Sequence, residues 1–211
     1  MELFVKRCNL DLYERVFDPI ESTVEPDRRA IVNQFAFEMF NLICLGGVTY
    51  GNLVSAIAEP EVLVAAAGTL AAPADTLSGA EVLEARELAR RMWLHFHHPR
   101  PTSITVKPAF KGCGLVMSCV GDVLASPDTI VEMKDGDRPF RSDEFRQLSI
   151  YAALFYNQEG VVPGRLQVLN SRRGTAVTIT TEEFAQQIAG QAASTYLYGI
   201  IRLMSESTIS Q

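Results

Sequence analysis

The chain has 211 residues, of which 47% are hydrophobic and 21% are charged, and its formal net charge at pH 7 is -6. This composition predicts a globular protein of one domain, or one domain with a helical elaboration, and excludes an intrinsically disordered chain. The acidic balance argues against a general nucleic-acid coat protein. Because no apolar run reaches the roughly 20 residues that cross a bilayer, and no secretion signal is evident, we expect a cytoplasmic protein without a membrane partner.

The first half of the chain carries helical patterns. An apolar repeat at helical spacing follows Pro26 and ends at Gly46, and residues 53–70 form a second helical region. Ser78, with a glutamate three residues later, has the spacing of a capping box. We therefore expect a helix that begins after Ser78 and ends before Pro99.

The hydrophobic period changes after this helix. Ile104 and Val106 alternate with polar neighbours, residues 113–124 form a long and mostly apolar run, and residues 129–134 follow a turn signal. These patterns predict three strands in a meander, the second of them nearly fully buried.

Further elements follow in the same alternating order. Ser142 suits a helix start, and the helix is expected to end before Gly160. Two strands should flank a turn at residues 171–174, and Thr180 should cap a last helix that runs to about residue 205. This element order predicts an α/β fold, a mixed sheet flanked by helices.

Three charged residues occupy places where a buried strand rarely carries them. Glu132 and Lys134 lie two residues apart in a predicted strand, so they share a face. A hairpin between the second and third strands would bring Asp122 beside Glu132. Because buried charges need compensation, these carboxylates and the Met133 carbonyl indicate a site for Mg²⁺, which could acidify water and polarise a phosphate. Lys134 could then stabilise charge on phosphoryl oxygens.

An ordinary ion pair at a strand end is the alternative for Glu132 and Lys134. With four lysines and 25 acidic residues, the acid-x-Lys triplet is expected about half a time by chance. The helix after the strands strengthens the case for a site. Gln147 and Tyr151 lie four residues apart on one helix face, where they could hold a phosphate or a nucleotide, although half-buried helix faces often carry such pairs.

The segments that carry the charged residues match a known pattern when taken together. They are Phe110-Lys111-Gly112-Cys113-Gly114-Leu115, Gly121-Asp122, Glu132-Met133-Lys134 and Arg146-Gln147-Leu148-Ser149-Ile150-Tyr151. The combination resembles the PD-(D/E)XK nuclease superfamily and, within it, the RecB-like branch. The resemblance covers about residues 79–170.

This resemblance implies a restriction-endonuclease-like αβββαβ core over residues 79–211, with residues 1–78 as a mostly helical N-terminal extension. It also implies metal ligation by Asp122 and Glu132, a catalytic Lys134, and a Gln147/Tyr151 motif near the substrate.

The sequence departs from the family in two places. Aligning Gly79 with the glycine of the family's Gly-x-x-x-His motif puts Leu83 where the histidine stands, and the neighbouring Glu84 is the alternative metal ligand. Some members hold an iron–sulfur cluster through cysteines near the C-terminus. No cysteine follows Cys119, so we expect no such cluster.

The function implied is a Mg²⁺- or Mn²⁺-dependent deoxyribonuclease. Residues 100–175 carry ten basic and eight acidic side chains and form the one net basic segment. The lack of an ATP-binding loop or a helix-turn-helix predicts recruitment by a helicase or another subunit, or self-association, in DNA repair, recombination or phage defence. Candidates for DNA backbone contact, each also explicable as a solubilising surface charge, are Lys107, Lys111, Arg138, Arg141, Arg146, Arg172 and Arg173.

The alternative is a non-catalytic interaction module that retains a nuclease scaffold. Residues 1–78 lie outside the matched core and contain Phe35, Phe37, Phe40 and Tyr50, which could form a docking surface.

Overall fold

The computed structural model describes residues 1–70, 77–99, 102–134 and 136–206. They divide into a sheet unit, Met1–Arg15, Ser103–Asn170 and Thr175–Gln211, and a helical unit, Val16–Thr102 and Ser171–Gly174. The expected boundary after residue 78 lies within the Val16–Thr102 segment of the helical unit. The first 15 residues join the sheet unit, and the helix that follows Ser78 belongs to the helical unit.

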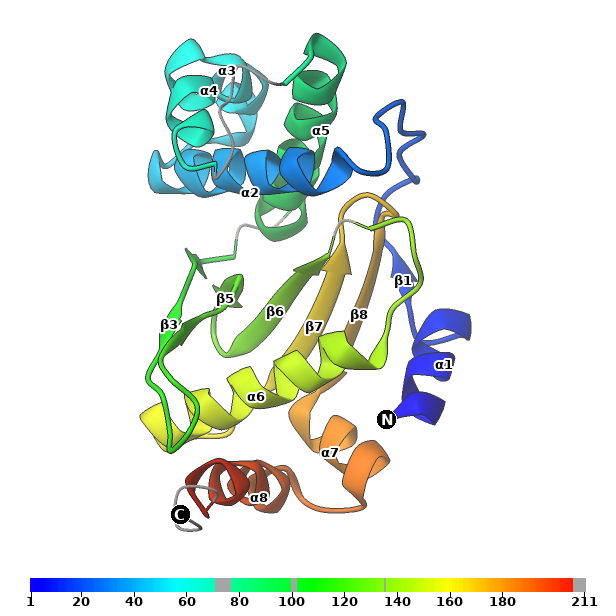
Figure 1. The fold of residues 1–211 in the computed structure, drawn as a ribbon, viewed down its shortest axis with the longest axis vertical. Coiled ribbons are helices and arrows are strands. Elements are labelled where there is room, and N and C mark those ends of the chain that lie inside the picture. Colours follow the sequence, from blue (N-terminus) through cyan, green and yellow to red (C-terminus); the bar gives the residue numbers. More distant parts are fainter. Residues whose placement is uncertain (71–76, 100–101, 135, 207–211) are drawn as a thin grey trace. The chain divides into compact units, whose positions relative to one another are not determined.

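The sheet unit is built on a six-stranded mixed sheet with the order β1-β8-β7-β6-β5-β2 (Figure 1). The pair β6–β7 is parallel and the other pairs are antiparallel. Helices flank the sheet, so the fold is α/β as expected. The strands are β1 (Glu14–Arg15), β2 (Ile104–Val106), β5 (Val123–Ala125), β6 (Thr129–Lys134), β7 (Arg165–Asn170) and β8 (Thr175–Thr180).

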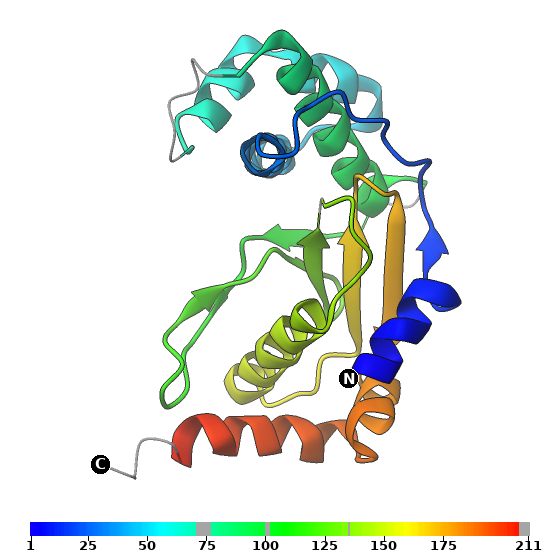
Figure 2. The ribbon, with the colours of Figure 1, turned by 45° about the vertical axis from the view of Figure 1, so that its right-hand side comes forward.

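Helix α6 (Ser142–Glu159) connects the two parallel strands, β6 and β7, and lies across one face of the sheet (Figure 2). It begins where expected and ends at Gly160, whose φ of 73° suits a glycine in the left-handed region. Ile130 and Leu148 are buried in the core that α6 covers, and helix α1 (Glu2–Leu10) adds Phe4 to it. The rings of Phe4 and Phe145 meet edge to face at 5.1 Å.

The expected last helix is two helices. Thr180 caps α7 (Thr181–Ala189), which ends at Gly190 with a φ of 64°. Helix α8 (Ala193–Glu206) follows and packs against α7 and α6. A left-handed glycine of this kind commonly ends a helix, so Gly190 is the physical reason for the break.

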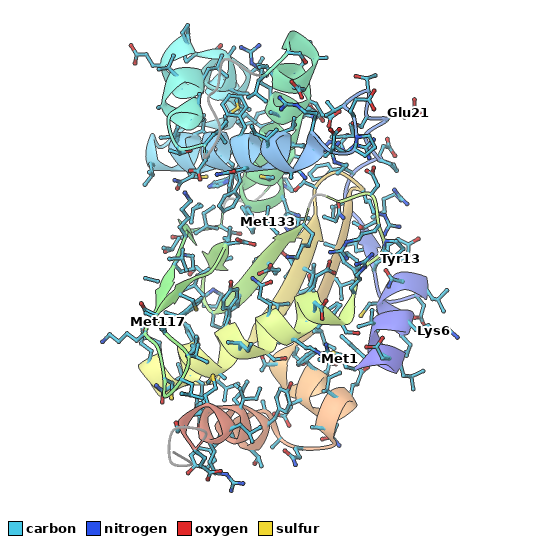
Figure 3. All side chains as sticks on the ribbon, viewed as in Figure 1. Met1, Lys6, Tyr13, Glu21, Met117 and Met133 are labelled. Atoms are coloured by element: carbon cyan, nitrogen blue, oxygen red, sulfur yellow. The ribbon has the colours of Figure 1, made fainter. Side chains whose placement is uncertain are left out.

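The expectation of one buried strand over residues 113–124 was wrong. The chain instead forms a separate hairpin of β3 (Ala109–Phe110) and β4 (Cys119–Val120), and then β5. Within the hairpin loop, a Cβ on Gly112 would collide with the Val116 carbonyl. Met117, labelled in Figure 3, is 83% exposed and Leu115 is 60% exposed. The apolar run therefore does not mark a buried strand.

The helical unit contains α2 (Arg29–Leu45), a short 3-10 helix η1 (Tyr50–Asn52), α3 (Leu53–Ala58), α4 (Pro60–Ala67) and α5 (Gly79–His97). Helices α2 and α5 pack together, with Phe40 stacked on Phe96 at 6.0 Å. Ser78 caps α5 with Glu81 as expected. The expected helix over residues 53–70 is split because Pro60 opens a new helix at its first position, the place a proline tolerates best. Across the described parts of the chain, no helix is long and apolar enough to span a bilayer.

Candidate functional site

The β5–β6 hairpin brings two carboxylates together. Val123 pairs with Val131 in its antiparallel ladder. The residue before Val123, Asp122, therefore lies opposite the residue after Val131, Glu132. Lys134 follows on the same face of β6 as Glu132, while Met133 points its side chain to the other face. The structure thus brings together the three charged residues that the sequence singles out.

Hydrogen bonds tie this group to the strands. Asp122 Oδ2 accepts a hydrogen bond of 2.7 Å from the backbone amide of Met133. Glu132 Oε1 accepts one of 2.6 Å from Lys134 Nζ. The other oxygen, Glu132 Oε2, is buried and has no hydrogen-bond partner among the described residues. Since Glu132 is only 1% exposed, this oxygen is a deeply buried acceptor that the described protein does not satisfy.

Burial shifts both carboxyl groups toward their neutral forms, and repulsion by Asp122 adds to the shift of Glu132. The pKa of Glu132 is raised to about 7, first by burial and then by the charge of Asp122, with Lys134 opposing and Glu144 adding to the rise. Burial also raises the pKa of Asp122, against the opposing effects of the Met133 amide and Lys134. A cation placed between them would favour the ionised pair.

Gln147 and Tyr151 form a bonded pair on α6, which packs against β6. Gln147 Nε2 donates to Tyr151 Oη at 2.7 Å, and Tyr151 Oη donates to the Val120 carbonyl at 3.3 Å. Phe110 stacks on the tyrosine ring at 5.4 Å. Burial raises the pKa of Tyr151, and the charges of Glu132 and Asp122 add to the rise while Gln147 opposes it. The tyrosine hydroxyl therefore interacts electrostatically with both carboxylates.

Glu144 is a buried acid near the site that sequence reasoning did not assign to it. Its side chain is 4% exposed, and its oxygens pair with Arg138 Nη1 at 2.9 Å and with the Arg141 backbone amide at 2.9 Å. Its charge adds to the raised pKa of Glu132. The sequence predicted that Glu144 lies in the first turn of α6. A glutamate in a capping box is usually exposed, so the sequence offered no reason to expect it to be buried near Glu132.

The predicted phosphate contacts differ in their surroundings. Arg146 is 61% exposed and bonds Asp143 at 3.1 Å. With Arg141, it lines a pocket of about 310 Å³ at the start of α6. Arg138 is 44% exposed and Lys111 lies exposed on the β3–β4 hairpin. These four cations belong to the sheet unit and are accessible to an anion.

Two predicted site residues pair with each other in the helical unit. Arg172 is 1% exposed, forms a short ion pair with Glu84 Oε1, and donates to Asn33 Oδ1 at 2.7 Å. Glu84 Oε2 accepts a 2.7 Å hydrogen bond from Ser22. The expectation that Arg172 contacts DNA needs correction, because its guanidinium is buried and held by a carboxylate. Arg173 belongs to the same unit and is half-buried.

The donor set beside Lys134 is small. Within the described residues, no three His, Cys, Asp or Glu side chains converge as a metal-binding group. Mg²⁺ commonly takes only one or two protein carboxylates and keeps water for its other ligands, so Asp122, Glu132 and the Met133 carbonyl fit its chemistry. The unpartnered Glu132 Oε2 fits it as well.

Comparison with known proteins identified no relative of this chain. No family model matches the chain, and no curated protein or solved structure matches it. The assignment of chemistry therefore depends on the residues of this chain and on their geometry.

Proposed function

We propose that the protein is a metal-dependent nuclease of the PD-(D/E)XK type, with a restriction-endonuclease-like core and Asp122, Glu132 and Lys134 at its active site. One observation carries the proposal. Glu132 is buried opposite a second carboxylate and bonded on one side by a lysine, and its other oxygen has no described partner. A purely structural ion pair has no need of an unsatisfied buried oxygen, whereas a metal ligand does.

The metal would be held by Asp122, Glu132 and the Met133 carbonyl. Bound Mg²⁺ or Mn²⁺ supplies positive charge that polarises a phosphate and lowers the pKa of a water molecule. Lys134 is 26% exposed, so its ammonium can donate to a phosphoryl oxygen while Glu132 orients it. Tyr151, itself held by Gln147, donates to the Val120 carbonyl, two residues before Asp122, and so helps to fix the backbone that positions this carboxylate.

DNA is the substrate we infer. Lys111, Arg138, Arg141 and Arg146 offer accessible cations on the sheet unit for phosphate contact, and Lys107 adjoins Asp122 through a backbone hydrogen bond of 2.8 Å. Recruitment by a helicase or another subunit of a repair, recombination or phage-defence system accords with the absence of a sequence motif for ATP binding.

Cleavage assays test this proposal. The purified protein is incubated with linear, circular and single-stranded DNA in Mg²⁺, Mn²⁺ or EDTA, beside Glu132→Gln, Lys134→Ala and a surface control, Arg202→Ala. Arg202 lies on α8, is 63% exposed and pairs with Glu206 of the same helix. We expect metal-dependent cleavage that falls by about 100-fold or more in the two site variants and is unchanged in the control. Cleavage that persists in EDTA and in both variants would refute the assignment.

A non-catalytic module is the second candidate, and the Glu132–Lys134 bond of 2.6 Å favours it, because the pair already neutralises its own charge. Calorimetry with Mn²⁺ separates the two. Binding that disappears in Glu132→Gln supports the nuclease, while a folded protein that binds no Mn²⁺ and cuts no DNA supports the module.

A further inference from the structure

A small pocket opens between α3 and α5 of the helical unit, well separated in sequence from the proposed active site. Its volume is about 210 Å³. Val54 and Leu83 form walls that are 73% and 64% exposed, and the buried Ile57 lines it as well. Pockets for drug-sized ligands start at roughly 300 Å³, so this one suits one or two amino-acid side chains rather than a cofactor.

The pocket also carries an unengaged cation. Arg86 lines it, makes no described hydrogen bond or ion pair, and has a buried Nε without a partner among the described residues. Its neighbour Arg90 differs, because Arg90 binds Glu87 through two nitrogens at 2.7 and 2.8 Å. Glu87 is bonded by Arg91 as well, at 2.7 Å, which leaves no carboxylate charge for Arg86. The pocket thus combines aliphatic walls with the positive charge of Arg86, which no carboxylate among the described residues neutralises.

The chemistry that complements this pocket is an aliphatic side chain beside a carboxylate. Helix α4 of the same chain presents that pair. Glu61 is exposed and Val64, three residues later, is 72% exposed, so both project from one side of the helix. Both are outside the core of the helical unit. Leu45 and Tyr50 of the same unit are also exposed, by 78% and 61%.

We propose that the helical unit is a self-association surface, in which α4 of a second copy places Val64 between Val54 and Leu83 and directs Glu61 to Arg86. A two-fold pair of copies makes such a contact twice, which enlarges an interface built from small elements. The carboxylate would pair with the guanidinium, for which the described residues of one copy provide no partner, and Val64 would be removed from water. The inference concerns assembly and does not depend on whether the sheet unit cleaves DNA.

A charge-swap experiment tests this contact in the 211-residue chain. Molar mass is measured by light scattering and sedimentation over a wide concentration range for wild type, Arg86→Glu, Glu61→Arg and the double variant. We expect concentration-dependent association, a dissociation constant raised about tenfold or more by each single change, and recovery to within about threefold in the double variant. Arg202→Glu, which changes the charge equally on the sheet unit, should associate as wild type does.

Val64→Asp keeps the test decisive if a change at the partly buried Arg86 disturbs folding. Val64 is largely exposed, so the variant should retain its circular dichroism spectrum and unfolding midpoint while association weakens about tenfold or more. A wild type that stays monomeric at its highest soluble concentration would overturn the proposal and leave the pocket to an acidic peptide of another protein or to nucleic acid. Association that survives both Glu61→Arg and Val64→Asp would overturn it equally.

Discussion

Glu84 in the helical unit and Glu132 in the sheet unit are both buried and paired with a cation, and the two pairs are built differently. In the helical unit, Glu84 bonds Arg172 with one oxygen and Ser22 with the other, and Arg172 also binds Asn33. In the sheet unit, Glu132 bonds Lys134 with one oxygen while the other has no described partner.

The difference separates a structural pair from a candidate site. A guanidinium offers several donors in a fixed fork, so Arg172 can satisfy two side chains at once and remain buried. A lysine ammonium is a compact charge, and Lys134 is 26% exposed, so it can turn from Glu132 toward another anion. Burial and a second acid, Asp122, together raise the pKa of Glu132, whereas Glu84 is bound by Arg172 and Ser22. A satisfied carboxylate holds the fold together, and an unsatisfied one is available for a ligand.

The largest effect expected on stability comes from breaking the satisfied pair. Arg172→Met leaves Glu84 as a buried charge without its cation, which should lower the free energy of unfolding by about 3–5 kcal/mol. The double variant Arg172→Met/Glu84→Met should recover most of this loss, because no charge stays buried. Urea denaturation at pH 7 measures both. A single variant within about 1 kcal/mol of wild type would show that the pair is solvated and that the contrast with Glu132 does not hold.

Glu132 should behave in the opposite way in metal-free buffer. Its pKa is about 7 in the folded protein and near 4.5 when unfolded. As pH rises through 4.5 the unfolded state loses its proton first, so wild type loses stability between pH 4.5 and 7 and keeps that deficit above pH 7. Glu132→Gln lacks this loss and should be more stable at pH 8 in EDTA by about 3 kcal/mol.

Thermal and urea unfolding across this pH range, with and without Mn²⁺, provide the measurement. Added Mn²⁺ should stabilise wild type and leave Glu132→Gln unchanged. If Glu132→Gln is less stable than wild type at pH 8 in EDTA, Glu132 is a structural residue like Glu84.

A smaller effect should follow from the hydroxyl of Tyr151. Tyr151→Phe removes the donor to the Val120 carbonyl and the acceptor for Gln147, so we expect a loss of about 1 kcal/mol in stability. Since Val120 lies two residues before Asp122, Mn²⁺ affinity should also fall, by a few-fold, in calorimetric titrations. Unchanged Mn²⁺ affinity with lowered stability would limit this tyrosine to a packing role.

Local pattern explains where the sequence predicted the fold well. Strand β6 and helix α6 match their expected bounds because turn residues flank a short apolar-rich run in the first and a helical repeat in the second. The prediction for residues 113–124 was wrong because hydrophobicity alone does not distinguish a buried strand from an exposed hairpin. The glycines in this segment were better evidence for a turn. The first 15 residues carry no strong period, and their place beside β8 depends on long-range pairing.

The same limit applies to the charged residues. The proximity of Asp122 and Glu132 was predictable because a short hairpin relates them. Glu84 and Arg172 lie 88 residues apart in sequence, and no local pattern relates a helix residue to a turn so distant. Sequence spacing could therefore propose the open carboxylate pair, but it could not recognise that Glu84 and Arg172, assigned to metal and DNA, bind each other.

The turn between β7 and β8 affects how the chain can be divided into smaller folded fragments. Residues 171–174 belong to the helical unit although both flanking strands belong to the sheet, so the polypeptide passes between the units four times. A truncated chain that keeps only the sheet would have to close β7 onto β8 without this turn, and one that keeps only the helices would lose the cation held by Glu84. Either truncation should therefore unfold at a lower temperature than the untruncated chain, because each removes residues that the remaining unit needs.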